Sequence, residues 1–154
     1  MQYWLMKSEP EEFGIEDLEA APRRTEPWDG VRNYQARNFM RDDMKKGDLA
    51  FLYHSNCAEP GIAGIMKISR EAYADHTAFD PGDKHFDPKS DPGDPRWFMV
   101  DVTFKRRLKR IITLKELKLH AEKELAGFRL LQRGNRLSIM PVEKKCWDFI
   151  LSLE

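Results

Sequence analysis

The sequence Leu49-Ala50-Phe51-Leu52-Tyr53 is apolar at both of its alternating sets of positions. Successive side chains of a β-strand point to opposite faces of a sheet, so a strand that is apolar throughout is covered on both faces. We therefore expect this stretch to be a strand near the centre of the sheet. It is followed by His54-Ser55-Asn56, and polar side chains at the rim of a sheet often belong to binding sites.

Other strands and helices are interleaved along the chain without internal repeats. The further predicted strands are Tyr3–Lys7, Ile62–Ile68, Trp97–Phe104 and Leu137–Met140. The predicted helices are Ile15–Ala20, a helix from Asn33 to Met44, a helix from a Thr113-Leu114-Lys115-Glu116 capping box towards His120, and Glu143–Leu153. Strands and helices do not alternate regularly, which predicts an α+β domain with a curled mixed β-sheet flanked by short helices.

The size of the chain, 154 residues with 41% hydrophobic content, predicts a single domain over residues 1–154. Cys57 and Cys146 have no spacing typical of a zinc site or a redox pair, which predicts plain thiols in a reducing compartment. No run approaches the ~18 apolar residues of a membrane span. We expect a soluble, intracellular monomer without a cofactor or metal, cytoplasmic in a bacterium and nuclear in a eukaryote.

The segment Trp28–Met40 combines aromatic, guanidinium and amide side chains behind a Pro-Trp-Asp-Gly turn. This mixture suits a site that stacks a nucleobase better than it suits a core. Two faces are predicted for the helix that follows. The apolar face, which should pack on the sheet, carries Ala36, Phe39, Met40 and Met44, and the polar face carries Tyr34, Arg37, Asn38 and Arg41.

The net charge is zero, yet Arg96–Glu154 contains 14 Lys and Arg against 7 Asp and Glu, a balance of about +7. The densest basic run is Lys105-Arg106-Arg107-Leu108-Lys109-Arg110. This run could contact phosphates, or it could be a solvated strand edge that its charges protect from aggregation.

Several motifs occur in a characteristic order along the chain: Tyr3–Pro10, Trp28–Phe39, Tyr53–Asn56, Gly61–Gly64 and Arg136–Pro141. Together they closely resemble the EVE domain, specifically the thymocyte nuclear protein family, from end to end of the sequence. The resemblance implies a PUA-like pseudo-barrel, related to the PUA, ASCH and YTH domains. It also implies a non-catalytic reader that binds a modified nucleobase, a modified cytosine in DNA or RNA, inside an aromatic-walled pocket.

The resemblance to YTH domains implies that Trp28 is one aromatic wall and that Lys7 and Ser8 lie near the base edge. The candidates for a second wall are Tyr34, Tyr53 and Trp97. The full predicted pocket comprises Lys7, Ser8, Trp28, Val31, Asn33, Tyr34, Tyr53, His54, Ser55, Asn56 and Trp97. The predicted phosphate contacts are Arg32, Arg37, Arg41, Lys105 and Arg106.

Each of these assignments has a structural alternative. Trp28 could anchor its loop in the core, Asn33 could cap the following helix, and His54 could be a hydrogen-bonded rim residue. Arg32 and Arg37 could be paired with carboxylates. The remaining cases are strand termination by Lys7 and Ser8, and surface packing by Tyr34.

No catalytic constellation is evident in the sequence. Neither Ser8 nor Ser55 lies in a G-x-S-x-G elbow, and nothing predicts a reactive thiol at Cys57. The acidic segment Asp80–Pro95 departs from the calcium-loop pattern and is predicted to be a solvated loop. The alternative function is an enzyme or sensor acting on a small nucleotide-like or anionic metabolite, which salt dependence would separate from a nucleic-acid reader.

Overall fold

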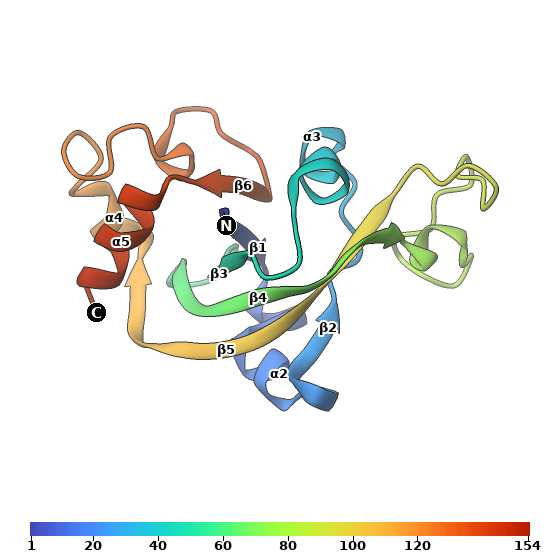
Figure 1. Cartoon of the computed structure of the whole chain (residues 1–154), viewed down its shortest axis with the longest axis horizontal. Coiled ribbons are helices and arrows are strands. Elements are labelled where there is room, and N and C mark those ends of the chain that lie inside the picture. Colours follow the sequence, from blue (N-terminus) through green and yellow to red (C-terminus); the bar gives the residue numbers. More distant parts are fainter.

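A computed structural model describes all residues from 1 to 154. Its centre is a six-stranded sheet in the order β2-β5-β4-β3-β1-β6, in which β1 and β3 are parallel and the other pairs antiparallel. The strands are β1 (Tyr3–Ser8), β2 (Thr25–Pro27), β3 (Leu49–His54), β4 (Gly61–Ala74), β5 (Phe98–Thr113) and β6 (Ile139–Val142). Figure 1 shows β4 and β5 as long curved strands. The α+β architecture with a curled mixed β-sheet flanked by short helices is therefore confirmed.

The helices are short and surround this sheet. The α-helices are α1 (Pro10–Phe13), α2 (Ile15–Ala20), α3 (Tyr34–Asn38), α4 (Leu114–Lys118) and α5 (Lys144–Ser152). The other helical turns are η1 (Pro22–Arg24), the π-helical η2 (Phe39–Asp43), η3 (His76–Phe79) and η4 (Arg129–Leu131). Figure 1 places α2 beside β2, and α4 beside α5 at the other end of the sheet. None of the helices has the length and apolar character needed to cross a membrane.

Strand β3 has the predicted central place, between β1 and β4. Ala50 and Leu52 belong to one core, whereas Phe51 and Tyr53 belong to a second core that includes Trp147 of α5. The two sets alternate along the strand, as expected when both faces of a sheet are covered.

The predicted apolar stripe after Asn33 is also confirmed. Ala36, Met40 and Met44 are buried in the first core, with Phe39 packed against it. The helix is not α-helical throughout, because α3 continues directly into a π-helical turn in which Met44 N donates to Phe39 O at 2.9 Å. This turn keeps both Met40 and Met44 buried.

Strand β5 runs to Thr113, well beyond the predicted end at Phe104, so the basic run Lys105–Arg110 is part of a strand. Strand β2 was not predicted, because its three residues become a strand only by pairing with remote Asp101–Thr103. The Thr113 cap is present, with Thr113 Oγ1 accepting from Glu116 N at 3.1 Å. The carboxylate of Glu116 binds Arg110 and makes no return bond to the helix start, so the capping box is incomplete.

Candidate functional site

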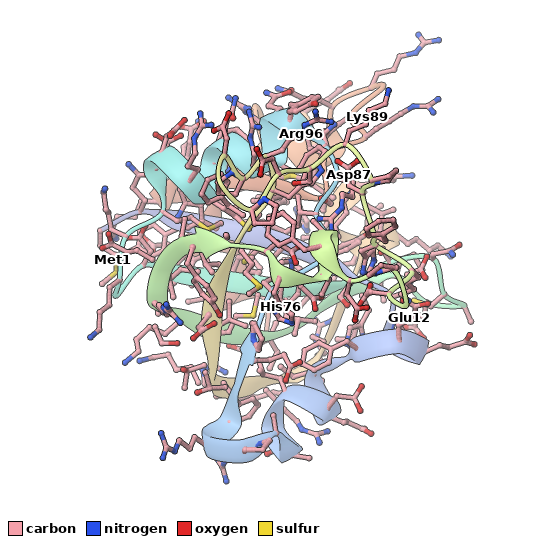
Figure 2. The ribbon with its side chains drawn as sticks, turned by 90° about the vertical axis from the view of Figure 1, so that its right-hand side faces the viewer. Met1, Glu12, His76, Asp87, Lys89 and Arg96 are labelled. Carbon is pink, nitrogen blue, oxygen red and sulfur yellow. The ribbon has the colours of Figure 1, made fainter.

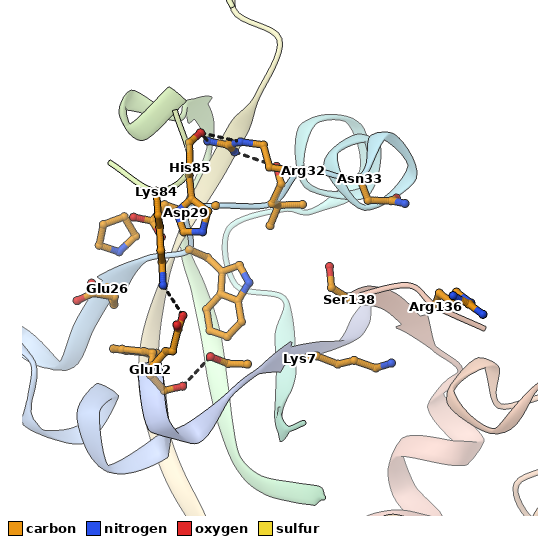
Figure 3. Close-up of a pocket in the computed structure, with 16 residues that line it drawn as sticks. Lys7, Glu12, Glu26, Asp29, Arg32, Asn33, Lys84, His85, Arg136 and Ser138 are labelled. Carbon is orange, nitrogen blue, oxygen red and sulfur yellow. Dashed lines mark hydrogen bonds and ion pairs between the residues drawn. The ribbon is translucent and has the colours of Figure 1, made fainter. Parts of the chain in front are cut away.

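A cavity of about 570 Å³ opens where β1 ends, beside the loop between β2 and α3. Its size is within the usual range of small-molecule and cofactor pockets. The lining residues come from β1, α1, β2, the β2–α3 loop, the loop after η3 and the segment before β6 (Figure 3). They are Lys7, Ser8, Glu12, Phe13, Glu26, Pro27, Trp28, Asp29, Gly30, Val31, Arg32, Asn33, Lys84, His85, Arg136 and Ser138.

The turn that carries Trp28 depends on a glycine. Trp28 N donates to Val100 O of β5 at 2.7 Å, which ties the turn to the sheet. Gly30 has a φ of +77°, and a Cβ atom built on it would lie 2.5 Å from the His85 ring. A side chain at this position would therefore meet both an unfavourable backbone conformation and a clash.

Asp75 stabilises the same turn through hydrogen bonds. Its fully buried carboxylate accepts hydrogen bonds from Gly30 N at 2.8 Å, Thr77 Oγ1 at 2.6 Å and Arg32 Nη1 at 3.0 Å. Burial alone would raise the pKa of Asp75, but the bonds from Thr77, Gly30 and Arg32 hold that pKa below its ordinary value. Arg32 also donates to His85 O at 2.8 Å, so its guanidinium is engaged in holding two loops together and is not free for a phosphate.

Trp28 borders the cavity but is only 8% exposed. Its ring packs edge-on against Phe13 with centroids 6.3 Å apart, and it belongs to the first core. The indole N–H groups of Trp4 and Trp97 donate to Asp48 and Asp87, whereas that of Trp28 has no partner in the protein. Trp28 is thus a core anchor that offers the cavity an unsatisfied donor and little stacking surface.

One side of the cavity is acidic. Desolvation, together with repulsion from Asp29 and Asp101, raises the pKa of Glu26. Desolvation and repulsion from Asp75 raise the pKa of Asp29. Glu12 is paired with Lys84 at 2.5 Å, an ion pair that Figure 3 shows beside the acidic side. This side therefore offers carboxyl groups as hydrogen-bond acceptors.

The opposite side of the cavity carries Lys7, Asn33, Arg136 and Ser138 (Figure 3). Asn33 Oδ1 accepts from Ala36 N at 2.9 Å, so Asn33 caps α3, and its amide nitrogen has no protein partner. Burial lowers the pKa of Lys7. The neighbouring Ser8 is satisfied within the fold, because its hydroxyl donates to Phe13 O at 2.6 Å.

None of the candidates for a second aromatic wall lines the cavity. Tyr34 and Trp97 stack on each other with centroids 4.9 Å apart, and the Arg37 guanidinium lies 4.8 Å from the Tyr34 ring. Tyr53 is buried in the second core. The ammonium of Lys7, which lines the cavity, lies 6.0 Å from the Tyr53 ring. Trp28 faces the first core, so the alternation of β3 separates Tyr53 from it.

The predicted rim residues after β3 also lie outside the cavity. His54 Nε2 accepts from Ile15 N at 3.1 Å, and burial lowers the pKa of its ring. Asn56 donates from its amide to Glu9 Oε1 at 2.8 Å, and Ser55 is held by its backbone to Ser8 O. His54 therefore has the structural place of a hydrogen-bonded rim histidine.

The remaining predicted phosphate contacts are dispersed. Arg37 donates to Arg96 O at 2.9 Å, and Arg41 is paired with Asp42 at 2.8 Å. Arg106 makes a two-bond ion pair with Glu154, and Lys105 is exposed on β5. The structure does not bring these four side chains to the cavity.

The acidic loop before β5 contributes structure rather than a metal cluster. Asp87 accepts from Trp97 Nε1 at 2.7 Å and is paired with Arg96 at 3.4 Å. Figure 2, which faces this loop, shows Asp87 and Arg96 together at its upper part. Nowhere in the chain do three or more His, Cys, Asp or Glu side chains gather as potential metal ligands.

Sequence reasoning missed several lining residues. Glu26 and Pro27 lie in the unpredicted β2, and Lys84 and His85 reach the cavity from a loop far along the chain. A signal was present for Arg136 and Ser138, which belong to the motif Arg136–Pro141 that carries the EVE resemblance.

The family model of the EVE domain matches residues 2–153. The chain belongs to the EVE domain family. Thymocyte nuclear protein 1 of Danio rerio is 56% identical over 165 residues, covering 98% of this chain and 71% of the relative. The Homo sapiens protein is 54% identical over 166 residues, covering 99% of this chain and 73% of the relative.

Solved structures of similar proteins have the same fold as this EVE domain. A crystal structure of human THYN1 protein in complex with 5-methylcytosine-containing DNA matches with a TM-score of 0.95 and 52% identity, covering 99% of this chain and 97% of that one. An ASCH protein from Zymomonas mobilis matches with a TM-score of 0.57 at 11% identity, covering 99% of both chains, which extends the likeness of fold alone.

Proposed function

We propose that this EVE domain is a non-catalytic reader that binds a modified cytosine of DNA in the Trp28 cavity. The observation that carries the proposal is the close match to human THYN1, which was crystallised with 5-methylcytosine-containing DNA. The cavity of about 570 Å³ at the turn within the Trp28–Phe39 motif is the place we assign to the base.

The chemistry of the cavity suits the edge of a cytosine. The exocyclic N4 amine of cytosine is a donor, and carboxyl groups are suited to accept from it. Glu26 and Asp29 supply such acceptors on one side of the cavity. The unpartnered donors of Trp28 and Asn33 suit the acceptors N3 and O2 of the same base.

Extruding a base from a duplex costs a few kcal/mol, which contacts inside the pocket must offset. Because Trp28 is 8% exposed, stacking on its face contributes little unless Phe13 moves. Hydrogen bonds to the base edge are therefore the main source of affinity in this proposal, with the added methyl group read by the shape of the cavity.

The arrangement of nucleophiles supports a binding role. The hydroxyl of Ser8 donates to a backbone carbonyl, and Ser138 makes no hydrogen bond with a histidine. Cys57 lies outside the cavity. A side chain activated by an adjacent base, which nucleophilic catalysis requires, is absent from this group.

A second candidate is a sensor or enzyme for a small anionic nucleotide, because Lys7 and Arg136 are both unpaired at the cavity. The two proposals differ in salt dependence. A DNA reader that neutralises several phosphates weakens steeply as salt rises, whereas a small-ligand site responds little.

A binding panel tests the proposal. Duplexes with one cytosine, 5-methylcytosine or 5-hydroxymethylcytosine, in DNA and in RNA, are titrated with the wild-type protein at two salt concentrations. We expect the modified DNA to bind most tightly, with a steep salt dependence. Equal binding of modified and unmodified duplexes would contradict the reader function, and a flat salt response would favour the small-ligand alternative.

Trp28→Phe sharpens the panel, because Trp28→Ala would remove a buried aromatic ring and cost about 3–5 kcal/mol of stability. The Phe variant removes the unpartnered N–H and is expected to weaken 5-methylcytosine binding by roughly tenfold. Trp147→Phe, in the second core, is the matched control, since Trp147 is 3% exposed and lines no part of the cavity. Equal weakening by both variants would mean that Trp28 acts only through the fold.

A further inference from the structure

Four Lys and Arg side chains line the cavity, and they differ in whether a carboxylate already pairs with them. Arg32 is paired with Asp75 and Lys84 with Glu12, whereas Lys7 and Arg136 have no ion-pair partner. Figure 3 shows Lys7 and Arg136 on the side away from the acidic groups, with Ser138 between Lys7 and Asn33. The hydroxyl of Ser138 also has no hydrogen-bond partner in the protein. Unsatisfied donors are therefore concentrated on one side of the cavity.

The backbone holds these donors in place. Lys7 N donates to Ser138 O at 2.8 Å, which continues the antiparallel pairing of β1 with β6. The preceding Asn135 donates to Arg129 O at 2.7 Å and accepts from Leu137 N at 3.0 Å. Arg136 thus lies in a hydrogen-bonded segment between η4 and β6, directly beside the end of β1.

An anion with several acceptor oxygens would satisfy the Lys7 ammonium and the Arg136 guanidinium, whose charged ends lie on the same side in Figure 3. A guanidinium can bind two oxygens of a phosphate side by side, while an ammonium acts as a compact point charge. Half-burial lowers the pKa of Lys7 in the absence of any carboxylate partner, and a bound anion would oppose that effect.

We infer that Lys7 and Arg136 form a subsite for a phosphate adjacent to the base that occupies the cavity beside Trp28. This inference rests on the proposed function and names a contact that it leaves open. It differs from the sequence-based expectation, in which the phosphate contacts are Arg32, Arg37, Arg41, Lys105 and Arg106. The subsite positions the nucleotide, and the opposite acidic side reads the edge of its base.

The test uses duplexes with one 5-methylcytosine in which the phosphate on either side is replaced, one at a time, by an uncharged methylphosphonate. Wild-type protein, Lys7→Gln, Arg136→Gln and Lys118→Gln are titrated with each duplex and with its unmodified counterpart. Lys118 is the control, because it is an exposed lysine on α4 that lines no part of this cavity.

For the wild type we expect one of the two replacements to weaken binding by roughly tenfold or more. In Lys7→Gln and Arg136→Gln that penalty should shrink towards onefold, while the preference for 5-methylcytosine over cytosine persists. Lys118→Gln should keep both the penalty and the preference. Melting curves of each variant establish that it is folded.

A penalty of full size in both pocket variants would overturn the phosphate subsite and leave the reader function standing. If the wild type binds 5-methylcytosine and cytosine duplexes equally, the reader function is wrong. The effect of the methylphosphonate on binding would still show whether the phosphate subsite exists. Two neutral replacements without effect on the wild type would overturn the subsite directly.

Discussion

Two basic regions of this EVE domain differ in whether their charges are already engaged. The run Lys105–Arg110 is the denser one, yet Arg106, Arg107 and Arg110 are paired with Glu154, Glu19 and Glu116. The side of the cavity formed by Lys7 and Arg136 has only two cations, and neither is paired. Charge density in the sequence therefore does not show which cations the fold leaves without a partner.

The largest effect on stability and DNA binding is expected from Gly30→Ala, at the cavity. The new Cβ would lie 2.5 Å from the His85 ring at a φ of +77°, so the turn must shift. We expect about 1–3 kcal/mol of lost stability and loss of 5-methylcytosine DNA binding, measured by denaturant unfolding and titration.

Gly47→Ala is the control for Gly30→Ala. Its φ is +98°, but nothing lies within 4 Å of the added Cβ. It should share the backbone strain and retain DNA binding. If both glycine variants bind DNA normally, the Trp28 turn is not the ligand site.

The next largest effect is expected in the basic run Lys105–Arg110, where the arginines are paired with glutamates. Arg106→Gln leaves the carboxylate of Glu154, whose side chain is 7% exposed, without its cation. We expect about 1–3 kcal/mol of lost stability and an unchanged slope of log K against log salt for DNA binding. A slope that falls by about one unit would instead make Arg106 a phosphate contact, as the sequence alone suggested.

The ion pair between Arg106 and Glu154 should also make the stability of the fold depend on pH in acid. The hydrogen bonds from Arg106 lower the pKa of Glu154 from its ordinary value of 4.5 to about 2, against the opposing effect of burial. Because the folded-state pKa is depressed, the pair stabilises the fold above about pH 4.5, and this contribution is lost as the pH falls towards 2.

We expect the part of acid destabilisation due to Glu154 to be about 1–2 kcal/mol, since the Arg106 side chain is 43% exposed and solvent screens the pair. Unfolding curves between pH 5 and about 2 should therefore be flatter for Glu154→Gln than for the wild type. Identical pH profiles would mean that the ion pair with Arg106 does not lower the pKa of Glu154 in the folded protein.

The smallest effect is expected from Lys84→Gln at the cavity. Lys84 and Glu12 are 60% and 57% exposed, so the melting temperature should not change measurably. DNA binding should weaken by about twofold at low salt and be unaffected at high salt, because exposed charges are screened. A large loss at both salt concentrations would place Lys84 in direct contact with the ligand.

Much of the fold follows from local patterns. Ile15–Ala20 matches α2 residue for residue, and the stripe of Ala36, Met40 and Met44 is buried as predicted. The errors concern remote pairing. Strand β2 forms only against β5, and β5 continues to Thr113 because β4 pairs with it over nearly its whole length.

The candidate site was predicted in part. Lys7, Trp28 and Asn33 line the cavity, whereas Tyr34, His54 and others of the predicted set do not. Tyr34 carries the right chemistry but its ring stacks on Trp97. A side chain's partner depends on the packing of distant segments, which neither residue type nor helical spacing specifies.

Local sequence patterns were sufficient to predict the strands and helices with strong periodicity, the central place of β3 and the family resemblance. These features depend on backbone geometry and on which faces are apolar, and both are written locally. Which donors remain free depends on tertiary contacts, because β1, the segment before β6 and the loop after η3 meet at one cavity. Arg32 and Arg136 are both arginines, but only Arg32 meets a buried carboxylate.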